Sequence, residues 1–249
     1  MIQHLTDIVV EARKKGKKRL AVAYGQDSHT LEAVYNAYKE GLVEPTLFGE
    51  KAVIEQVCRE NDIDINAFTI VDEKSDVKCV QLAVAAVVAG VADVLMKGLV
   101  STDKYMRGIL NKEAGLFPPK GVLSHVSVIE IPSYHKLITV SDVAVIPLPD
   151  FKQKQKQIGY LAQTAKLLGI ATPKIACIAP SEQLLPSVIS STEGAILAKM
   201  GDRGQLGNVI VDGPLSIDVA LYKEVADHKK VKGSAVAGDP DCLLFPNIE

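Results

Sequence analysis

One stretch decides the fold, and it reads Val94-Leu95-Met96-Lys97-Gly98-Leu99-Val100-Ser101-Thr102-Asp103, continuing through Tyr105, Met106 and Arg107 to Leu110. Its apolar run stops at Lys97-Gly98 and is followed by hydroxyl residues and a helix-like segment, a pattern typical of a strand, a polar turn and a helix. Such turns often bind phosphate in α/β folds, because the free N–H groups of the first helical turn attract anions. The pattern therefore predicts an anion site built from the Lys97 ammonium, the Ser101 and Thr102 hydroxyls and these N–H groups.

The same alternation of strands and helices fills the residues before this stretch. Short apolar runs at Leu20–Tyr24, Glu44–Gly49 and Phe68–Val71 are predicted strands, and helical segments separate them. Strands that alternate with helices of about 11 residues require crossover connections, and therefore a mostly parallel sheet covered on both faces. We place the first domain at residues 1–120. The segment Gly115–Gly121, with two prolines and two glycines, is the predicted hinge because it cannot continue a helix.

A different pattern follows the hinge and predicts a second, mixed α/β domain at residues 121–235. Two long strands, Leu123–Ile131 and Leu137–Val145, are separated by a connection too short for a parallel crossover, so we expect an antiparallel hairpin. Further elements are predicted as helices at Lys152–Leu168, Glu193–Lys199 and Ile217–His228, and as strands at Lys174–Ala179 and Val209–Asp212. The predicted fold is thus a two-domain α/β protein with an active-site cleft between the domains.

The composition argues against several classes of protein. The chain has 28 basic and 30 acidic residues and a net charge of -2, so no basic surface is expected for nucleic acid or an anionic membrane. No run approaches the roughly 18 apolar residues of a membrane helix, and the first apolar segment, which carries Asp7 and Glu11, does not fit a signal peptide. The four cysteines show no CxxC pair or metal-ligand spacing. We therefore expect reduced thiols, no metal site and a cytoplasmic protein.

Two basic residues are the first candidates for catalysis. Lys97 ends an apolar strand, where a lysine has to project into a cleft or find a counter-charge. A salt bridge to Asp93 or Asp142 is the structural alternative. Arg107 lies on the following helix, and its guanidinium can hold a phosphate through two parallel hydrogen bonds. Its alternative role is that of an ordinary surface residue.

Acidic residues at the ends of predicted strands are the second group of candidates. Asp142 and Asp212 can each accept a proton, anchor a loop through hydrogen bonds, or form half of an ion pair. Asp212, followed by Gly213-Pro214, also fits a turn. His125 and His135 are not chosen as catalytic bases, because neither has a Ser-His-Asp or metal-binding spacing nearby.

Three common motifs are absent from the chain. It contains no G-x-x-x-x-G-K-[ST] P-loop, no G-x-G-x-x-G fingerprint and no G-x-S-x-G nucleophile elbow. Their absence counts against a nucleotidase, a Rossmann dehydrogenase and a serine hydrolase.

Six motifs, which together span nearly the whole chain, point to one family. In chain order they are Lys97-Gly98-Leu99-Val100, Leu110-Asn111-Lys112-Glu113-Ala114-Gly115-Leu116, Leu123-Ser124-His125-Val126, Tyr134-His135-Lys136 with Ser141-Asp142, Val211-Asp212-Gly213-Pro214-Leu215, and Ala237-Gly238-Asp239-Pro240-Asp241 with Pro246-Asn247-Ile248-Glu249. Their sequence and order resemble the phosphate acetyl/butyryltransferase family, and most of all its butyryl branch, the branched-chain phosphotransacylases. One Lys-Gly pair after a strand would be weak evidence, but six motifs in the family's order are strong.

The resemblance implies a reaction and a set of site residues. Family members move an acyl group between coenzyme A and inorganic phosphate, so acyl-CoA and phosphate are the expected partners. Coenzyme A would be a substrate, with no permanently bound cofactor, and a homodimer is expected. The predicted catalytic residues are Lys97, Arg107 and Asp142, and the predicted substrate- and phosphate-binding residues are Gly98, Ser101, Thr102, Ser124, Asp212 and Gly213. An arginine near the position of Arg107 resembles the acetyl branch, where it helps to bind the phosphoryl group, while the butyryl branch often carries lysine.

The resemblance also implies where the last residues belong and what alternatives exist. Residues 236–249, including the apolar segment Cys242–Pro246, are expected to return to the first domain and its sheet. Family members continue beyond this point with a segment that carries a Ser-Arg pair for phosphate and, in the acetyl branch, a catalytic aspartate. One alternative is therefore an acyl-CoA- and phosphate-binding protein without turnover. The other is a related NAD- and metal-dependent dehydrogenase of phosphorylated hydroxyacids, for which Asp212 and Asp218 are the spaced acidic pair.

Overall fold

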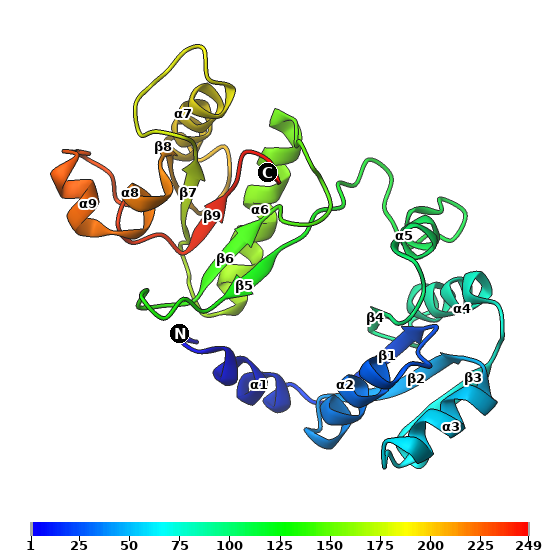
Figure 1. Cartoon of the computed structure of the whole chain (residues 1–249). Helices are drawn as coiled ribbons and strands as arrows, with labels where there is room; N and C mark the ends of the chain where they lie inside the picture. The colour runs from blue at the N-terminus through cyan, green and yellow to red at the C-terminus, as the bar shows by residue number, and fades with distance from the viewer. Residues whose placement is uncertain (1, 249) are drawn as a thin grey trace. The chain divides into compact units, whose positions relative to one another are not determined.

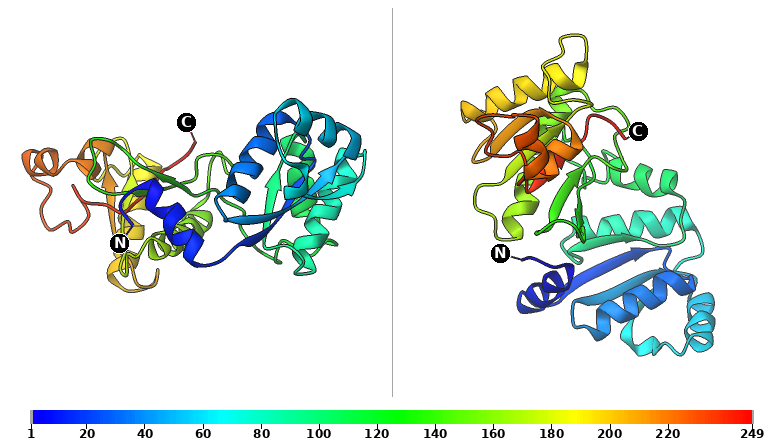
Figure 2. Two further views of the ribbon diagram at one scale, coloured as in Figure 1. Left: turned by 90° about the horizontal axis from the view of Figure 1, so that it is seen from below. Right: turned by 60° about the vertical axis from the view of Figure 1, so that its left-hand side comes forward.

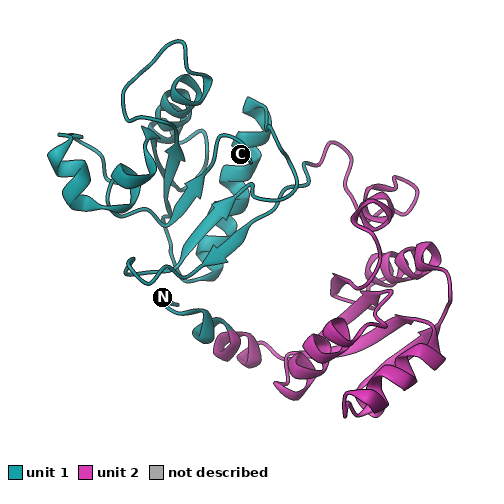
Figure 3. Ribbon diagram, in the orientation of Figure 1, with its two compact units in different colours: residues 1–8, 122–249 teal, residues 9–121 magenta. Residues whose placement is uncertain are grey.

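The computed structural model, drawn in Figure 1 and from two further sides in Figure 2, describes residues 2–248. It divides into two compact units, coloured separately in Figure 3. One unit comprises residues 9–121, and the other comprises the residues before and after it. The first helix, α1 (Leu5–Lys14), contains the boundary between the units. Within the described residues no helix is long and apolar enough to cross a membrane.

A four-stranded parallel sheet in the order β3-β2-β1-β4 forms the centre of the unit 9–121 (Figure 1). Its strands are β1 (Lys18–Ala23), β2 (Val43–Gly49), β3 (Thr69–Asp72) and β4 (Val94–Lys97). Its helices are α2 (Ser28–Lys39), α3 (Lys51–Glu60), α4 (Asp76–Val88) and α5 (Thr102–Leu110), with a short 3-10 helix at Ile65–Ala67. The prediction of a parallel sheet is confirmed.

The central strand β1 explains why helices cover both faces of this sheet, as Figure 2 shows. Leu20 and Val22 are buried in a core shared with α2 and α3, whereas Ala21 and Ala23 are buried in a second core shared with α4. Successive side chains of a strand face opposite sides of the sheet, so a continuously apolar strand needs a helical layer on each face.

The second unit is built on a five-stranded mixed sheet in the order β5-β6-β9-β7-β8. Its strands are β5 (Ser127–Ile129), β6 (Ile138–Ser141), β7 (Lys174–Ile178), β8 (Ile210–Leu215) and β9 (Cys242–Leu244). The pair β5 and β6 is antiparallel, and all other pairs are parallel. The predicted hairpin is therefore confirmed, although its strands are shorter than expected. The chain turns after Ser141 because the Asp142 carboxylate accepts the N–H groups of Ala144 and Val145.

The last strand corrects one expectation. The segment Cys242–Pro246 was expected in the first sheet, but β9 lies in the second sheet, between β6 and β7 and parallel to both. Its three residues suit a central strand, because Cys242 and Leu244 are buried in one core of this unit and Leu243 in the other. An apolar run of this length has no periodicity that tells which of two sheets it joins.

Helices cover both faces of the second sheet as well. One core contains residues of α6 (Phe151–Leu167) and α7 (Ile189–Asp202), and the other contains residues of α8 (Ile217–Leu221) and α9 (Lys223–His228). The single helix expected over residues 217–228 is interrupted at Tyr222, which has extended dihedral angles. The Gly238 N–H donates to the carbonyls of Val219 and Ala220, which a continuous helix would have used itself.

One buried side chain in this unit predicts a stability change. Gln157 on α6 is fully buried, and neither polar atom of its amide has a hydrogen-bond partner among residues 2–248. A buried, unsatisfied polar group costs about 1–3 kcal/mol, so Gln157→Met should raise the free energy of unfolding by about 1–2 kcal/mol in urea titrations. The control is Gln163→Met, an exposed position on the same helix, which should change it by less than about 0.5 kcal/mol. Destabilisation by Gln157→Met would mean that the amide makes hydrogen bonds in solution.

Candidate functional site

The turn after β4 is fixed by its contact with the end of β1. The N–H groups of Gly98 and Leu99 donate to the carbonyls of Ala23 and Tyr24, at 2.9 Å each. A Cβ at Gly98 would collide with the Tyr24 carbonyl, so only glycine permits this approach. Lys97 is thereby held beside the carboxyl end of β1, at the edge of a parallel sheet where ligands usually bind.

The Lys97 ammonium has no carboxylate within ion-pair distance among residues 2–248. Its one hydrogen bond, a long one of 3.4 Å, goes to the carbonyl of the neighbouring Gly98. The alternative partner Asp93 is taken by Arg19, which donates to its carboxylate from two side-chain nitrogens at 2.6 and 3.0 Å. These bonds also hold the pKa of Asp93 well below its usual value. Lys97 is exposed, so its charge is available to a ligand.

One of the two hydroxyls at the start of α5 also has a structural role. Ser101 is the N-cap of α5, and its Oγ accepts the Lys104 N–H at 3.4 Å. Thr102 is the first helical residue and is exposed. Tyr105 donates its hydroxyl to the Leu95 carbonyl at 3.3 Å and so anchors α5 to β4. Ser101 and Thr102 thus lie at the N-terminus of α5, and Lys97 is the last residue of the strand that precedes it.

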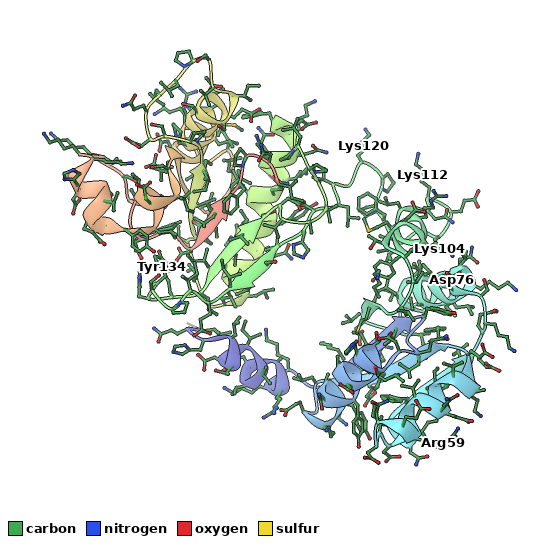
Figure 4. All side chains as sticks on the ribbon, in the orientation of Figure 1. Arg59, Asp76, Lys104, Lys112, Lys120 and Tyr134 are labelled. Atoms are coloured by element: carbon green, nitrogen blue, oxygen red, sulfur yellow. The ribbon has the colours of Figure 1, made fainter. Side chains whose placement is uncertain are left out.

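Arg107 lies at the other end of α5, in its last turn, with an exposed side chain. The guanidinium Nε donates to the Asp103 carboxylate at 3.0 Å, so the side chain runs back toward the first turn of the helix. Arg107 also lines a groove of about 890 Å³ between α4 and α5. The neighbouring Lys104 pairs with Asp76 at 2.6 Å, as the labelled side chains in Figure 4 illustrate.

In the other unit, Asp142 gathers four hydrogen bonds. Its buried carboxylate accepts the Ser124 hydroxyl at 2.8 Å, the His125 N–H at 3.1 Å and the N–H groups of Ala144 and Val145 at 2.8 Å each. Burial alone would raise the pKa of Asp142, but these bonds outweigh burial and lower it. Asp142 therefore fits the loop-anchoring alternative, and it fixes the orientation of the Ser124 hydroxyl.

Asp212 and Gly213 lie within β8 rather than in a free turn. The Gly213 N–H donates to the Asp212 carboxylate at 2.8 Å, and a Cβ at Gly213 would lie 2.6 Å from the Cβ of Cys177. Gly213 is therefore required for the close packing of β8 against β7. Asp218 pairs with Lys229 at 3.1 Å and, with Asp212, belongs to no cluster of metal-ligating side chains in the described part of the chain.

The two histidines and the four cysteines considered in the sequence lie in surroundings that fit a structural role. His125 contributes its backbone N–H to Asp142, and its ring nitrogen lies 3.5 Å from the Ser127 hydroxyl. His135 contacts Asp239 at 3.0 Å. All four cysteines are buried free thiols.

A buried ion pair was missed by the reading of the sequence. Lys154 on α6 donates from Nζ to Glu193 on α7 at 2.5 Å, and the Lys154 side chain is only 6% exposed. A signal was present, because Lys154 is spaced from Ile158, Leu161 and Ala165 as one helical stripe, whereas Lys156 is not.

Comparisons with known proteins agree on one family. A family model described as phosphate acetyl/butaryl transferase matches residues 4–83 and 77–249. A phosphate butyryltransferase of Clostridium acetobutylicum is 40% identical over 249 residues, which is 100% of this chain and 82% of that protein. A phosphate acetyltransferase of Thermotoga maritima is 38% identical over 245 residues, covering 98% of this chain and 82% of that protein. A branched-chain phosphotransacylase from Enterococcus faecalis has a crystal structure that superposes with a TM-score of 0.80 at 27% identity, covering 93% of this chain and 80% of that one.

Proposed function

Because the chain belongs to the phosphate acetyl/butyryltransferase family, we infer that it catalyses transfer of an acyl group between coenzyme A and inorganic phosphate. The observation that carries this inference is the 40% identity to a phosphate butyryltransferase along the whole chain. Neither a dehydrogenase nor a protein without turnover is favoured, because the relatives above are named as acyltransferases. The protein is accordingly a phosphate acyltransferase whose substrates include coenzyme A.

We propose that Lys97 and Arg107 hold the phosphate oxygens, assisted by the hydroxyls of Ser101 and Thr102 and by the Gly98 turn. The support is the exposed ammonium of Lys97, which lies at the end of β4 shortly before the N-terminus of α5 and has no carboxylate within ion-pair distance among residues 2–248. For the second unit we propose that the Ser124 hydroxyl contacts substrate while Asp142 positions it. The Asp212 side chain, on β8, would contact the substrate. Gly213 would allow β8 to lie close to Cys177 on β7.

We further propose direct transfer within a ternary complex, with no covalent acyl-enzyme and no permanent cofactor. The phosphate oxygen attacks the thioester carbon, the C–S bond breaks, and the thiolate leaves and takes up a proton. Alignment of two bound reactants is worth about 7–11 kcal/mol of the barrier, so a nucleophilic side chain is not required. All four cysteines are buried, and burial raises the pKa of Cys79 to about 11, which makes it a poor nucleophile.

A series of acyl-CoA substrates tests the butyryl assignment. We expect phosphate-dependent thiol release to be fastest with butyryl-CoA, isobutyryl-CoA or valeryl-CoA and slower with acetyl-CoA, because the best-matching relative above is a butyryltransferase. The measurement is kcat/KM for each acyl-CoA at fixed phosphate. Activity restricted to acetyl-CoA would place the protein in the acetyl branch instead.

We also propose a cytoplasmic homodimer. The support is the family's expected assembly and the net charge of -2 with four unpaired cysteines. Light scattering should give about twice the 26.7 kDa of one chain, and a particle of 26.7 kDa would contradict the dimer.

A further inference from the structure

The residue directly after β1 has an unusual backbone conformation. Tyr24 has a φ of 57°, in the left-handed region. A side chain crowds the backbone in this region, and tyrosine is not among the residue types, Asn, Asp and His, that adopt it most readily. Such a conformation persists only where the surrounding structure enforces it, and it is often found at functional sites.

Three other non-glycine residues in the described part of the chain share this conformation, and each lies where it is commonly found. Asp62 and Lys230 directly follow the C-caps of α3 and α9, where a left-handed residue often ends a helix. Lys120 lies in a turn of the segment Gly115–Gly121. Tyr24 differs from all three because it directly follows a strand of the sheet.

The left-handed backbone directs the Tyr24 carbonyl toward the turn after β4. In an extended strand, successive carbonyls point to opposite sides. Here the Ala23 carbonyl accepts the Gly98 N–H and the Tyr24 carbonyl accepts the Leu99 N–H, at 2.9 Å each. Helical dihedral angles of either hand direct neighbouring carbonyls the same way, so the φ of Tyr24 accounts for both bonds. The two residues after Lys97 are therefore both held by the end of β1.

Packing on both sides leaves the Tyr24 peptide little freedom to move. The Tyr24 side chain is partly buried and packs against the core that α4 shares with the sheet. On the other side the backbones are in close contact, since a Cβ at Gly98 would collide with the Tyr24 carbonyl and lie 2.9 Å from the Cα of Gly25. The place of Lys97, next to Gly98 in the chain, thus depends on the backbone of Tyr24.

We propose that Tyr24 is a positioning residue for the reaction, and that its left-handed backbone fixes the turn that carries Lys97 and so holds the ammonium where phosphate binds. Tyr24 touches neither phosphate nor the acyl group and acts through Lys97. An ammonium that occupies the binding position for only a fraction of the time weakens the apparent affinity in proportion to that fraction. The inference rests on the proposed role of Lys97 in acyl transfer to phosphate.

Two substitutions of Tyr24 separate the effect of its backbone from that of its ring. Tyr24→Asn and Tyr24→Val both remove the ring, but Asn adopts the left-handed conformation readily, whereas a β-branched residue resists it. Tyr24→Val should raise the dissociation constant and KM for phosphate about tenfold, the result of a competent fraction that falls to about a tenth. Tyr24→Asn should raise them about twofold or less, because it retains the backbone conformation. The measurements are equilibrium dialysis with inorganic phosphate and KM for phosphate.

Two control experiments test whether the effect is specific to this turn. Asp62→Val places a β-branched residue at another left-handed position of the same unit, and should lower stability without changing KM for phosphate. In a Lys97→Ala background, Tyr24→Val should lower kcat/KM by less than about twofold, because the ammonium that it positions is absent. A loss of about tenfold in that background would overturn the proposal, as would equal effects of Tyr24→Asn and Tyr24→Val.

A milder variant keeps the comparison decisive if Tyr24→Val does not fold. Alanine resists the left-handed conformation less than valine does, so Tyr24→Ala should raise KM for phosphate about threefold. Equal values for Tyr24→Ala and Tyr24→Asn would then contradict the proposal. Dialysis requires no turnover, so wild-type protein that binds phosphate without releasing thiol would refute the proposed function, whereas the differences between the variants judge the role of Tyr24 separately.

Discussion

Replacing Lys97 with alanine should lower kcat/KM for acyl transfer to phosphate by about 10² or more. A decrease of that size corresponds to about 2.7 kcal/mol of transition-state stabilisation, which is the loss expected when a charged contact to the transferred group is removed. Lys97 is exposed at the end of β4, and no hydrophobic core residue is affected, so the fold should be unchanged by circular dichroism. Phosphate affinity should fall together with kcat/KM.

Arg107→Ala should cause a loss of similar size, and the double variant should cost less than the sum of the two single losses because both residues act on one anion. The matched control is Arg59→Ala, since Arg59 also lies in the last turn of a helix in the same unit and is exposed (Figure 4). Unchanged kinetics in Arg107→Ala would make Arg107 a surface residue paired with Asp103. The phosphate site would then rest on Lys97 with Ser101 and Thr102.

Asp142→Asn should lower the free energy of unfolding by about 3 kcal/mol, measured by urea titration. Asn can still accept the N–H groups of Ala144 and Val145, but its amide nitrogen would face the donors Ser124 Oγ and His125 N–H. Hydrogen bonds to a charged group contribute about 1.5–3 kcal/mol each, and two are lost. Ser124→Ala removes only one bond and should cost about half as much. A stable Asp142→Asn protein would show that these bonds contribute little.

The effect of Asp142→Asn on the free energy of unfolding should depend on pH. The pKa of Asp142 is lowered in the folded protein, so its ionised form contributes stability above the unfolded value of about 3.9. That contribution is lost as pH falls from about 4 toward the lower folded pKa. The difference in unfolding free energy between wild type and Asp142→Asn should therefore narrow below about pH 4. A constant difference down to pH 2 would contradict the assigned hydrogen bonds.

Most of the fold could be predicted because its elements follow local patterns. The short apolar run of β1 and the helical segment after Ser101 are local signals, and the strand and the helix that they predict are confirmed. The predicted position of β9 was wrong. The sheet that a strand joins depends on residues far away in the sequence, and three apolar residues alone do not indicate which sheet that is. The break at Tyr222 depends on Gly238, a residue 16 positions away in the sequence.

The candidate site was predictable to a lesser degree. The position of Lys97 at the end of a strand was sufficient to identify it as a candidate site residue. That Lys97 forms no ion pair with Asp93 could not be predicted, because Asp93 pairs with Arg19 on the neighbouring strand β1. The role of Asp142 depends on four donors that only the folded loop brings together. Lys154 was missed because a lysine in the run Lys152–Lys156 looks like a solvated residue until its helical phase is considered.

The most direct test of acyl transfer to phosphate is ³¹P NMR of the protein with butyryl-CoA and inorganic phosphate. We predict a new acyl phosphate resonance that grows in step with the released coenzyme A thiol, and that disappears when coenzyme A is added in excess. Thiol release at the same rate without phosphate, with no acyl phosphate resonance, would contradict the assignment of this chain as a phosphate acyltransferase.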